Sequence, residues 1–272
     1  MSEFIQNIEI THPDKILFPE SKISKLDVAK YYEKVSDKIL PFLKGRPVTL
    51  VRNPEGINEK GFYQRHPSES FPEYIERVKI KEKSGEKDLY IAIDEVSDLI
   101  YLSNLGVLEY HAWLSKIEDL EHPDMLIFDL DPDPKSDWNK VIEAALWLKE
   151  RLEKQGFKPK ARVSGGKGIH VVAYYKEKIT WKRSKEFTKN IALELVEYDP
   201  DNYLIDLSKA KRAGKVFIDF YRNERGATAV VPYSLRARPG ASICMEVNWE
   251  DVNSELRPDK FKLQSFKALP GN

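Results

Sequence analysis

The sequence predicts an α+β fold, in which strands pair as hairpins and helices stand between them at irregular intervals. Residues 78–93, VKIKEKSGEKDLYIAI, are typical of two strands joined by a charged loop from Glu82 to Asp88. Residues 160–175, KARVSGGKGIHVVAYY, are typical of two strands joined by a glycine-rich turn. These hairpins and the irregular order of the elements favour α+β over a doubly wound parallel sheet.

Four segments have apolar residues at helical spacing and are therefore predicted to be helices. Ser24 is expected to cap the first of them, which should end near Pro41, and Gly156 is expected to stop the third. The four segments are residues 24–43, 97–105, 136–156 and 180–201.

Further strands are predicted from short apolar runs that turn residues separate. The run that contains Val48 to Arg52 is closed by a Pro-Gly turn. The others are residues 60–66, the stretch around His111, residues 125–131, residues 215–223 and the end of the Pro- and Gly-broken segment 231–250.

Composition limits the class of protein. The chain has 44 basic and 44 acidic residues, so its total charge gives no hint of nucleic acid, although a basic groove can still be segregated on a neutral protein. Cys244 is the single cysteine, which excludes an intrachain disulfide framework and a cysteine-cluster zinc site. No apolar run approaches the ~20 residues of a membrane helix, and the N-terminus lacks the pattern of a secretory signal. We therefore expect a cytoplasmic protein with no membrane partner.

Two carboxylates stand at the end of the apolar run MLIFDLDPDP. Asp129 and Asp131 are two residues apart and so point to the same side of a strand. Like charges this close raise one pKa strongly unless a cation shares the site, and oxygen ligands of this kind suit magnesium or manganese. The alternative is that both acids cap the next helix or lie on a solvated strand end. Asp133, which follows Pro132, is given no catalytic role.

A third carboxylate, Asp219, is predicted in the middle of the apolar strand KVFIDFYRN. A carboxylate in such a place needs a strong reason to stay there, because burying an unpaired charge is costly. Two aspartates from one strand and a third from another form the usual ligand set of a two-metal phosphoryl-transfer site. The alternative is a buried aspartate that pairs with Arg222 or Arg212.

The glycine-rich turn SGGKG, residues 164–168, can bring backbone N–H groups close to an anion. Ser164 adds a hydroxyl and Lys167 a charge, while His170 lies in the next strand. The turn is not a Walker motif, because no helix follows it. A simple hairpin turn is the alternative. Three glycines with Ser and Lys exceed what such a turn requires, so we favour phosphate binding.

Basic residues gather around Asp219 and towards the C-terminus, which suits a metal-bound polyphosphate, although arginine-rich loops are often only solvated. His111, in LEYHAW, lies in an apolar context where a lone histidine is more often a satisfied core residue. The basic residues are Arg212, Lys215, Arg222, Arg225, Arg236 and Arg238.

Taken in order along the chain, eight sequence blocks resemble the polymerase domain of bacterial ligase D, a member of the archaeo-eukaryotic primase superfamily. The resemblance covers nearly the whole chain and implies one primase-polymerase domain over residues 1–272, with a mixed or antiparallel catalytic sheet flanked by helices. A smaller, β-containing lobe that binds DNA ends is expected over residues 1–110, and a catalytic core over residues 111–272. The blocks are HPDKILFPESKISKLD, GRPVTLVRNPEG, GFYQRH, LEYHAW, IFDLDP, SGGKGIHV, KVFIDFYRN and YSLRARPGA.

The resemblance implies the residues of a nucleotide site. His111 would lie near the sugar, and Arg52 would support that pocket. The catalytic residues, which would bind two divalent metal ions with manganese favoured over magnesium, are Asp129, Asp131 and Asp219. The residues that would bind the incoming nucleoside triphosphate, mostly through its phosphates, are Ser164, Lys167, His170, Arg222 and Arg236.

The resemblance also implies DNA-binding residues. Lys15 and Lys25 match a pair that recognises a 5′-phosphate on the downstream strand. Phe62 and Tyr63 match aromatics that lie against the template, which suits base stacking. Arg212 matches a residue of a mobile loop that organises the synapse of two DNA breaks. Two positions depart from the family pattern: Tyr63 stands where phenylalanine is common, and His12 stands where asparagine is common.

We therefore expect a metal-dependent, template-directed nucleotidyltransferase that prefers ribonucleotides and fills gaps at 5′-phosphorylated breaks during non-homologous end joining. Its substrates would be NTP or dNTP and double-stranded DNA ends with 3′ overhangs or gaps. Its partners would be Ku and a separate ATP-dependent DNA ligase at the nucleoid. One alternative is a de novo primase, which the pair of Lys15 and Lys25 disfavours. Another is a non-catalytic module that tethers DNA ends, which the three aspartates disfavour.

Some properties stay open from the sequence. The chain contains no K-x-D-G ligase motif, so it is expected to be either an excised domain or a polymerase made as a separate chain. Template dependence, the preference for the sugar and the oligomeric state on DNA are undecided. The charged loop from Glu82 to Asp88 is either solvated or closes on DNA.

Overall fold

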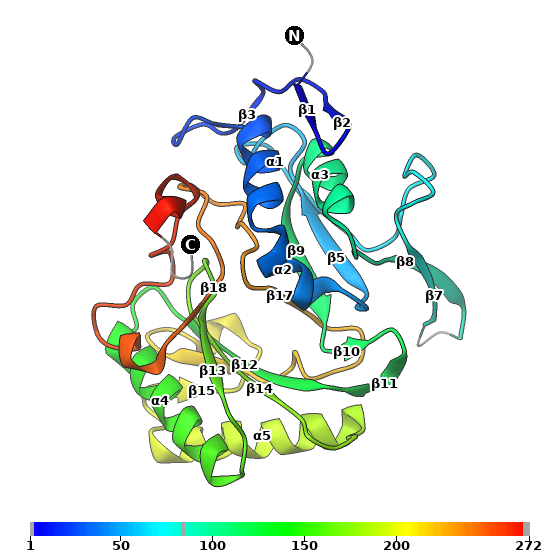
Figure 1. Cartoon of the computed structure of the whole chain (residues 1–272). Coiled ribbons are helices and arrows are strands. Elements are labelled where there is room, and N and C mark those ends of the chain that lie inside the picture. The colour runs from blue at the N-terminus through cyan, green and yellow to red at the C-terminus, as the bar shows by residue number, and fades with distance from the viewer. Residues whose placement is uncertain (1–2, 83–84, 269–272) are drawn as a thin grey trace. The chain divides into compact units, whose positions relative to one another are not determined.

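The computed structural model describes residues 3–82 and 85–268, and the chain divides into two compact units (Figure 1). Within these described residues, the first unit takes in the chain up to Trp113, then Thr228–Cys244 and the stretch from Phe261 onwards. The second unit takes in Leu114–Ala227 and Met245–Lys260. The fold is α+β with mainly antiparallel sheets, as the sequence predicted.

The first unit is built on a six-stranded antiparallel sheet in the order β17-β9-β5-β8-β7, with β6 paired to β5. The charged loop predicted before β8 is only partly described, because residues 83 and 84 lie outside the described residues. The strands are β5 (Val48–Arg52), β6 (Phe62–Gln64), β7 (Arg77–Lys81), β8 (Lys87–Ile91), β9 (Val107–Trp113) and β17 (Thr228–Val230). Two short hairpins pair β1 (Glu3–Ile5) with β2 (Ile8–Ile10), and β3 (Ile16–Phe18) with β4 (Ile23–Ser24).

The single helix predicted over residues 24–43 is wrong, because the structure has α1 (Lys25–Lys34) and α2 (Ser36–Leu43) there. Val35 separates them with φ −96° and ψ 5°, and a β-branched residue is a poor helix former. The predicted cap is confirmed, because the Ser24 hydroxyl accepts a hydrogen bond from the Asp27 N–H and Asp27 accepts one from the Ser24 N–H. The third helix of this unit is α3 (Val96–Asn104).

The second unit has a six-stranded sheet in the order β15-β16-β12-β14-β13-β18. All neighbours are antiparallel except β15 and β16, which are parallel. The strands are β12 (Met125–Pro132), β13 (Lys160–Val163), β14 (Ile169–Tyr174), β15 (Tyr203–Leu204), β16 (Val216–Asp219) and β18 (Met245–Val247). A separate hairpin pairs β10 (Ser115–Lys116) with β11 (Asp119–Pro123).

Helices α4 (Trp138–Lys154) and α5 (Trp181–Tyr198) lie along the sheet of the second unit (Figure 1). Asp137 caps α4. Gly156 follows the end of this helix with φ +80°, as the sequence predicted. Short 3-10 helices cover Lys209–Lys211, Trp249–Asp251 and Leu263–Ala268. Among the described residues, no helix has both the length and the apolar character needed to cross a membrane.

The turn from β13 to β14 lies directly against β12. A Cβ atom added to Gly168 would stand 1.7 Å from the carbonyl oxygen of Leu130, so no side chain fits there without movement of the backbone. Leu130 lies between Asp129 and Asp131 on β12. The glycine therefore lets the turn reach the strand that carries the two carboxylates.

Candidate active site

Asp129 and Asp219 lie directly opposite each other on the antiparallel strands β12 and β16. Asp131 follows two residues later on β12, opposite Phe217. The structure thus brings the three predicted carboxylates to neighbouring positions of one sheet. The prediction that Asp219 lies in the middle of its strand is wrong, because Asp219 is the last residue of β16 and the chain turns there. The N–H of Tyr221 donates to Asp219 Oδ1 at 2.9 Å and so holds this turn.

Cationic side chains converge on these carboxylates. Arg222 places Nε 3.2 Å from Asp219 Oδ2 and Nη2 3.5 Å from Asp129 Oδ2. His170, opposite Asp129 on β14, places Nε2 3.4 Å from Asp129 Oδ1. Burial raises the pKa of Asp219, the charge of Arg222 lowers it and the nearby Asp129 raises it, with a net upward direction.

Arg212 places its positive charge beside Asp131, as Arg222 does beside Asp219. Its Nη1 atom lies 3.9 Å from Asp131 Oδ2, and its guanidinium stacks 3.5 Å above the ring of Phe217, the residue opposite Asp131. Arg212 was predicted to contact DNA from a mobile loop. In the structure it stands beside a carboxylate of the candidate metal site.

The donor set suits a divalent cation, because three carboxylates on two neighbouring strands supply the oxygen ligands that hard metals prefer. As the side chains stand, Asp129, Asp131 and Asp219 each lie within 4 Å of an arginine. Over residues 3–82 and 85–268, no three His, Cys, Asp or Glu side chains are grouped so as to hold a metal ion. The sequence left open a pairing of Asp219 with Arg222, and the structure contains this ion pair.

The glycine-rich turn is organised by its own serine. Ser164 is 4% exposed, and its Oγ atom accepts hydrogen bonds from the N–H groups of Gly166 at 3.1 Å and Gly168 at 3.2 Å. Lys167 is exposed at the tip of the turn. His170 is 4% exposed, and its Nδ1 atom is buried with no hydrogen-bond partner among the described residues. The turn therefore offers a cation at its tip, close in sequence to a buried imidazole.

The basic residues that the sequence grouped together differ in their partners and in the unit to which they belong. Arg212 and Arg222 lie at the carboxylates, whereas Lys215 donates to the Pro200 carbonyl at 2.7 Å and Arg225 pairs with Glu121 at 2.9 Å. Arg236 and Arg238 belong to the first unit.

Asp133 has a structural use. Its Oδ1 atom accepts hydrogen bonds from the N–H groups of Gly214 and Lys135, both at 3.0 Å. These two hydrogen bonds lower the pKa of Asp133. The carboxylate therefore ties the end of β12 to the segment that leads into β16.

In the first unit, His111 and Arg236 are joined by Glu109, a residue that the sequence analysis missed. Glu109 Oε2 accepts from His111 Nε2 at 2.8 Å and from Arg236 Nε at 2.9 Å, and Oε1 accepts from the Ala237 N–H at 2.8 Å. Burial alone would raise the pKa of Glu109, but His111 and Arg236 outweigh it and lower that pKa to about 2. An acid in an otherwise apolar strand, two residues before His111, was the signal available in the sequence.

Arg52, predicted to support the nucleotide pocket, is anchored within the first unit. Its guanidinium donates to the Leu105 carbonyl at 3.1 and 2.9 Å and to Gln64 Oε1 at 2.9 Å, and it lies 5.2 Å from the centre of the Phe62 ring. Burial lowers the pKa of Arg52. Tyr63, next along β6, is 73% exposed, and its ring meets that of His111 edge-on at 6.4 Å. Arg52, Phe62, Tyr63 and His111 therefore lie on one sheet.

The two lysines predicted to read a 5′-phosphate are brought together. The Lys25 N–H donates to the Lys15 carbonyl at 2.8 Å. Lys15 Nζ pairs with Glu55 at 2.7 Å, and Lys25 Nζ donates to Thr11 Oγ1 at 3.3 Å and Asn104 Oδ1 at 3.4 Å. Burial, reinforced by the charge of Lys15 and opposed by that of Glu55, lowers the pKa of Lys25.

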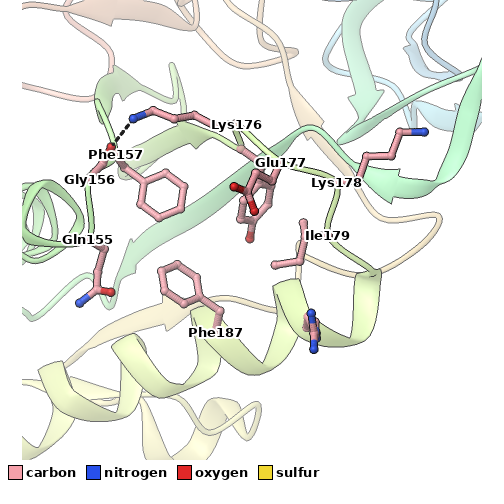
Figure 2. A pocket seen from close by; sticks show the side chains of 10 residues that line it. Gln155, Gly156, Phe157, Lys176, Glu177, Lys178, Ile179 and Phe187 are labelled. Carbon is pink, nitrogen blue, oxygen red and sulfur yellow. Dashed lines mark hydrogen bonds between the residues drawn. The ribbon is translucent and has the colours of Figure 1, made fainter.

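A pocket of about 420 Å³ lies elsewhere in the second unit, between the end of α4, the segment after β14 and the first turns of α5 (Figure 2). The rings of Phe157 and Phe187 face it, with centroids 5.6 Å apart, and Ile179 adds a third apolar side chain. None of the predicted site residues lines this pocket. Lys176, Lys178 and Arg183 also line it, but Asp129, Asp131 and Asp219 do not, so we assign it no part in the candidate active site.

The fold has known structural relatives. The polymerase domain of Mycobacterium tuberculosis ligase D in complex with DNA matches with a TM-score of 0.89 and 26% sequence identity, over 96% of this chain and 93% of that chain. The chain therefore has the fold of a ligase D polymerase domain.

Sequence comparison defines the family more closely. The family model described as LigD, primase-polymerase domain, matches residues 24–269. The chain therefore belongs to the LigD primase-polymerase domain family. It is 31% identical over 259 residues to the multifunctional non-homologous end joining protein LigD of Pseudomonas aeruginosa, and 29% identical over 259 residues to the bifunctional LigD of Bacillus subtilis. These matches cover 95% of this chain but only 31% and 41% of the two relatives.

Glu109→Gln is expected to lower the free energy of unfolding by roughly 2–3 kcal/mol at neutral pH, since a pKa of about 2 lies well below that of an unfolded glutamate. A depressed pKa gives stability that is present above the unfolded pKa of roughly 4.3 and is lost as the pH falls towards about 2. Urea unfolding followed by circular dichroism should therefore show the gap between wild type and variant shrinking from pH 5 to pH 3.

The matched control is Asp98→Asn. Asp98 is another buried carboxyl of the first unit, and burial raises its pKa. A raised pKa gives stability that is lost as the pH rises, so this control should show the opposite trend. A Glu109→Gln gap that stays constant over the whole pH range would contradict the assignment.

Proposed function

We propose that the protein is a metal-dependent, template-directed nucleotidyltransferase that extends 3′ ends and fills gaps at 5′-phosphorylated DNA breaks. The observation that carries the proposal is the direct opposition of Asp129 and Asp219 on adjacent strands, with Asp131 two residues away. Like charges in this arrangement call for a cation, and carboxylates from two strands suit a two-metal site. Membership of the LigD primase-polymerase family supports the same chemistry.

In this proposal Asp129, Asp131 and Asp219 hold two divalent metal ions, with manganese favoured over magnesium. When bound, the metal ions would lower the pKa of the primer 3′-hydroxyl and neutralise the leaving pyrophosphate. Arg222 would turn from the carboxylates to the triphosphate, because its forked guanidinium suits phosphate oxygens.

The turn between β13 and β14 would contribute to triphosphate binding. Lys167 and His170 would add donors to the phosphates, and Ser164 would hold the turn in shape through its two backbone hydrogen bonds. Arg212, beside Asp131, would leave that carboxylate when the segment around it engages DNA.

The first unit would supply contacts to the sugar and to the template. His111 and Arg236 would bind the nucleotide, and a partner for the 2′-hydroxyl at His111 would favour ribonucleotides. Phe62 is 45% exposed and Tyr63 73% exposed on their strand, and both would stack on template bases. Arg52 would hold the ring of Phe62 in place.

Lys15 and Lys25 would recognise the 5′-phosphate of the downstream strand. Two neighbouring ammonium groups repel each other, and burial further disfavours the charge of Lys25. A bound phosphate dianion would relieve both costs. Recognition of a downstream 5′-phosphate suits an enzyme that acts on a broken or gapped DNA end better than one that primes de novo.

The relatives suggest the setting of this activity. The curated relatives are named as non-homologous end joining proteins, and the solved relative is a complex with DNA. We propose that the protein acts on DNA ends in the cytoplasm, at the nucleoid, together with Ku and an ATP-dependent DNA ligase.

Asp129→Ala is expected to abolish extension of a gapped, 5′-phosphorylated duplex supplied with manganese and single nucleoside triphosphates, because the variant removes a metal ligand. Gel separation of the labelled primer measures the loss, which should reach at least about 100-fold. Asp133→Asn is the matched control. This neighbouring side chain accepts hydrogen bonds from the backbone N–H groups of Lys135 and Gly214, which an amide oxygen can also accept, so activity should persist. Extension by Asp129→Ala at the wild-type rate would refute the metal site.

Lys15→Ala is expected to bind a gapped duplex with and without the 5′-phosphate almost equally, whereas the wild type should prefer the phosphorylated duplex by roughly tenfold. Fluorescence anisotropy with labelled duplexes measures both affinities. Lys30→Ala, an exposed lysine on α1, should keep the wild-type preference. Equal binding of the two duplexes by the wild type would refute end recognition.

A further inference from the structure

One carboxylate in the first unit holds two of the residues assigned to the nucleotide. We propose that Glu109 is a positioning residue whose hydrogen bonds orient His111 and Arg236 together. This orientation would set the preference for ribonucleoside over deoxyribonucleoside triphosphates. The inference deepens the proposed function and rests on it, because it presumes that His111 and Arg236 meet the nucleotide.

Glu109 uses both of its oxygens. Oε2 accepts from His111 Nε2 at 2.8 Å and from Arg236 Nε at 2.9 Å, while Oε1 accepts from the Ala237 N–H at 2.8 Å. The residue is 5% exposed, so these three donors replace the water that an ionised carboxylate would otherwise hold. The contacts join strand β9 to a segment more than 120 residues later in the sequence.

The contacts require a carboxylate in particular. An ionised carboxylate only accepts hydrogen bonds, so the hydrogen shared with His111 lies on Nε2, which sets the tautomer of a neutral ring. An amide has one accepting oxygen and one donating nitrogen. Glutamine at this position would turn its NH2 group either towards the N–H donors of His111 and Arg236 or towards that of Ala237. Each orientation loses at least one of the three hydrogen bonds.

The strand that carries Glu109 is itself held firmly. β9 lies between β5 and β17. Both the N–H and the carbonyl of Tyr110 form hydrogen bonds with the segment that leads to Arg236. The Tyr110 N–H donates to Ser234 Oγ at 2.9 Å, and its carbonyl accepts from the Val231 N–H at 3.1 Å. The Arg236 N–H donates to the Ser242 carbonyl at 2.8 Å. Glu109 therefore connects two side chains whose backbones are already in place, and its hydrogen bonds help to orient those side chains.

Orientation matters most for a hydrogen bond to a single sugar hydroxyl. Such a bond is directional, and a site built to pair with a hydroxyl discriminates against the analogue that lacks it. A His111 ring that lacks the hydrogen bond to Glu109 would bind the ribonucleotide less well, and this loss would be larger than that for the deoxyribonucleotide. A loose Arg236 would weaken binding of both. Loss of Glu109 is therefore expected to raise KM and to reduce the preference for ribose.

The test is steady-state extension of a gapped, 5′-phosphorylated duplex by wild type and Glu109→Gln, with one nucleoside triphosphate and its 2′-deoxy form. We expect KM for the ribonucleotide to rise about tenfold in the variant, with kcat changed by less than about threefold. The ratio of kcat/KM between the two sugars should fall to that of His111→Ala. The double variant should fall no further, because both changes disable the same contact.

Two further variants separate positioning from stability. Asp98→Asn removes another buried carboxylate of the same unit, one that accepts hydrogen bonds from the backbone N–H groups of Asp94 and Glu95 at 3.0 Å. A merely structural effect would lower the folded fraction in both variants and leave KM and the sugar ratio unchanged. Glu109→Asp keeps the charge and should give an intermediate sugar ratio, and it decides the matter if Glu109→Gln does not fold.

The outcomes are distinguishable. A wild type that adds no nucleotide refutes the proposed function. An active wild type whose Glu109→Gln and Glu109→Asp variants keep its KM and its sugar ratio refutes the positioning role alone.

Discussion

Two aspartates share one register position of a sheet, and the second unit is organised around their repulsion. The antiparallel pairing of β12 and β16 fixes Asp129 opposite Asp219, and a paired backbone cannot move apart to relieve the charges. Either protonation of one carboxylate or a nearby cation can relieve the repulsion. Arg222 lies across both carboxylates, and His170 approaches Asp129 from the other neighbouring strand. The turn beyond Asp219 and the strand order bring these groups to one place.

In the first unit, a buried carboxylate has enough hydrogen-bond donors and positive charge around it to stay ionised. Glu109 is a buried acid and Asp219 a partly buried one, both on strands, yet their pKa values move in opposite directions. Glu109 accepts three hydrogen bonds, and the two side chains that donate to it outweigh burial. At Asp219 a second carboxylate adds to burial, and Arg222 does not compensate for both. The first arrangement suits a fixed structural role, whereas the second leaves a demand for more positive charge.

Local patterns were enough to predict much of this fold. The hairpins, the capping of α1 by Ser24 and the end of α4 before Gly156 depend on residues near in sequence, and the structure has them. The two-residue period of a strand also placed Asp129 and Asp131 on one side of β12. The break at Val35 was missed because apolar residues keep helical spacing on both sides of it.

Contacts between distant segments could not be predicted in this way. The role of Glu109 depends on Arg236, and β17 joins β9 from a segment more than 100 residues later. Ser164 turns its hydroxyl to its own turn, which residue type alone does not reveal. The basic residues near Asp219 separate because Lys215 and Arg225 find partners outside the carboxylate cluster. Sequence chemistry thus identified the groups, and tertiary structure decided which of them meet.

The approach of Gly168 to β12 also has a consequence for how this gene can vary. Every missense change in a glycine codon adds at least a Cβ atom, and at residue 168 that atom would meet the Leu130 carbonyl at 1.7 Å. A Cβ added at Gly85 or Gly156 meets nothing within 4 Å, although both have positive φ. In a library of random variants, position 168 should therefore retain glycine codons alone, whereas at the other two positions the positive φ, and not a collision, opposes a side chain. Mutational tolerance at position 168 would then report the close approach of the turn between β13 and β14 to β12, without any measurement of activity.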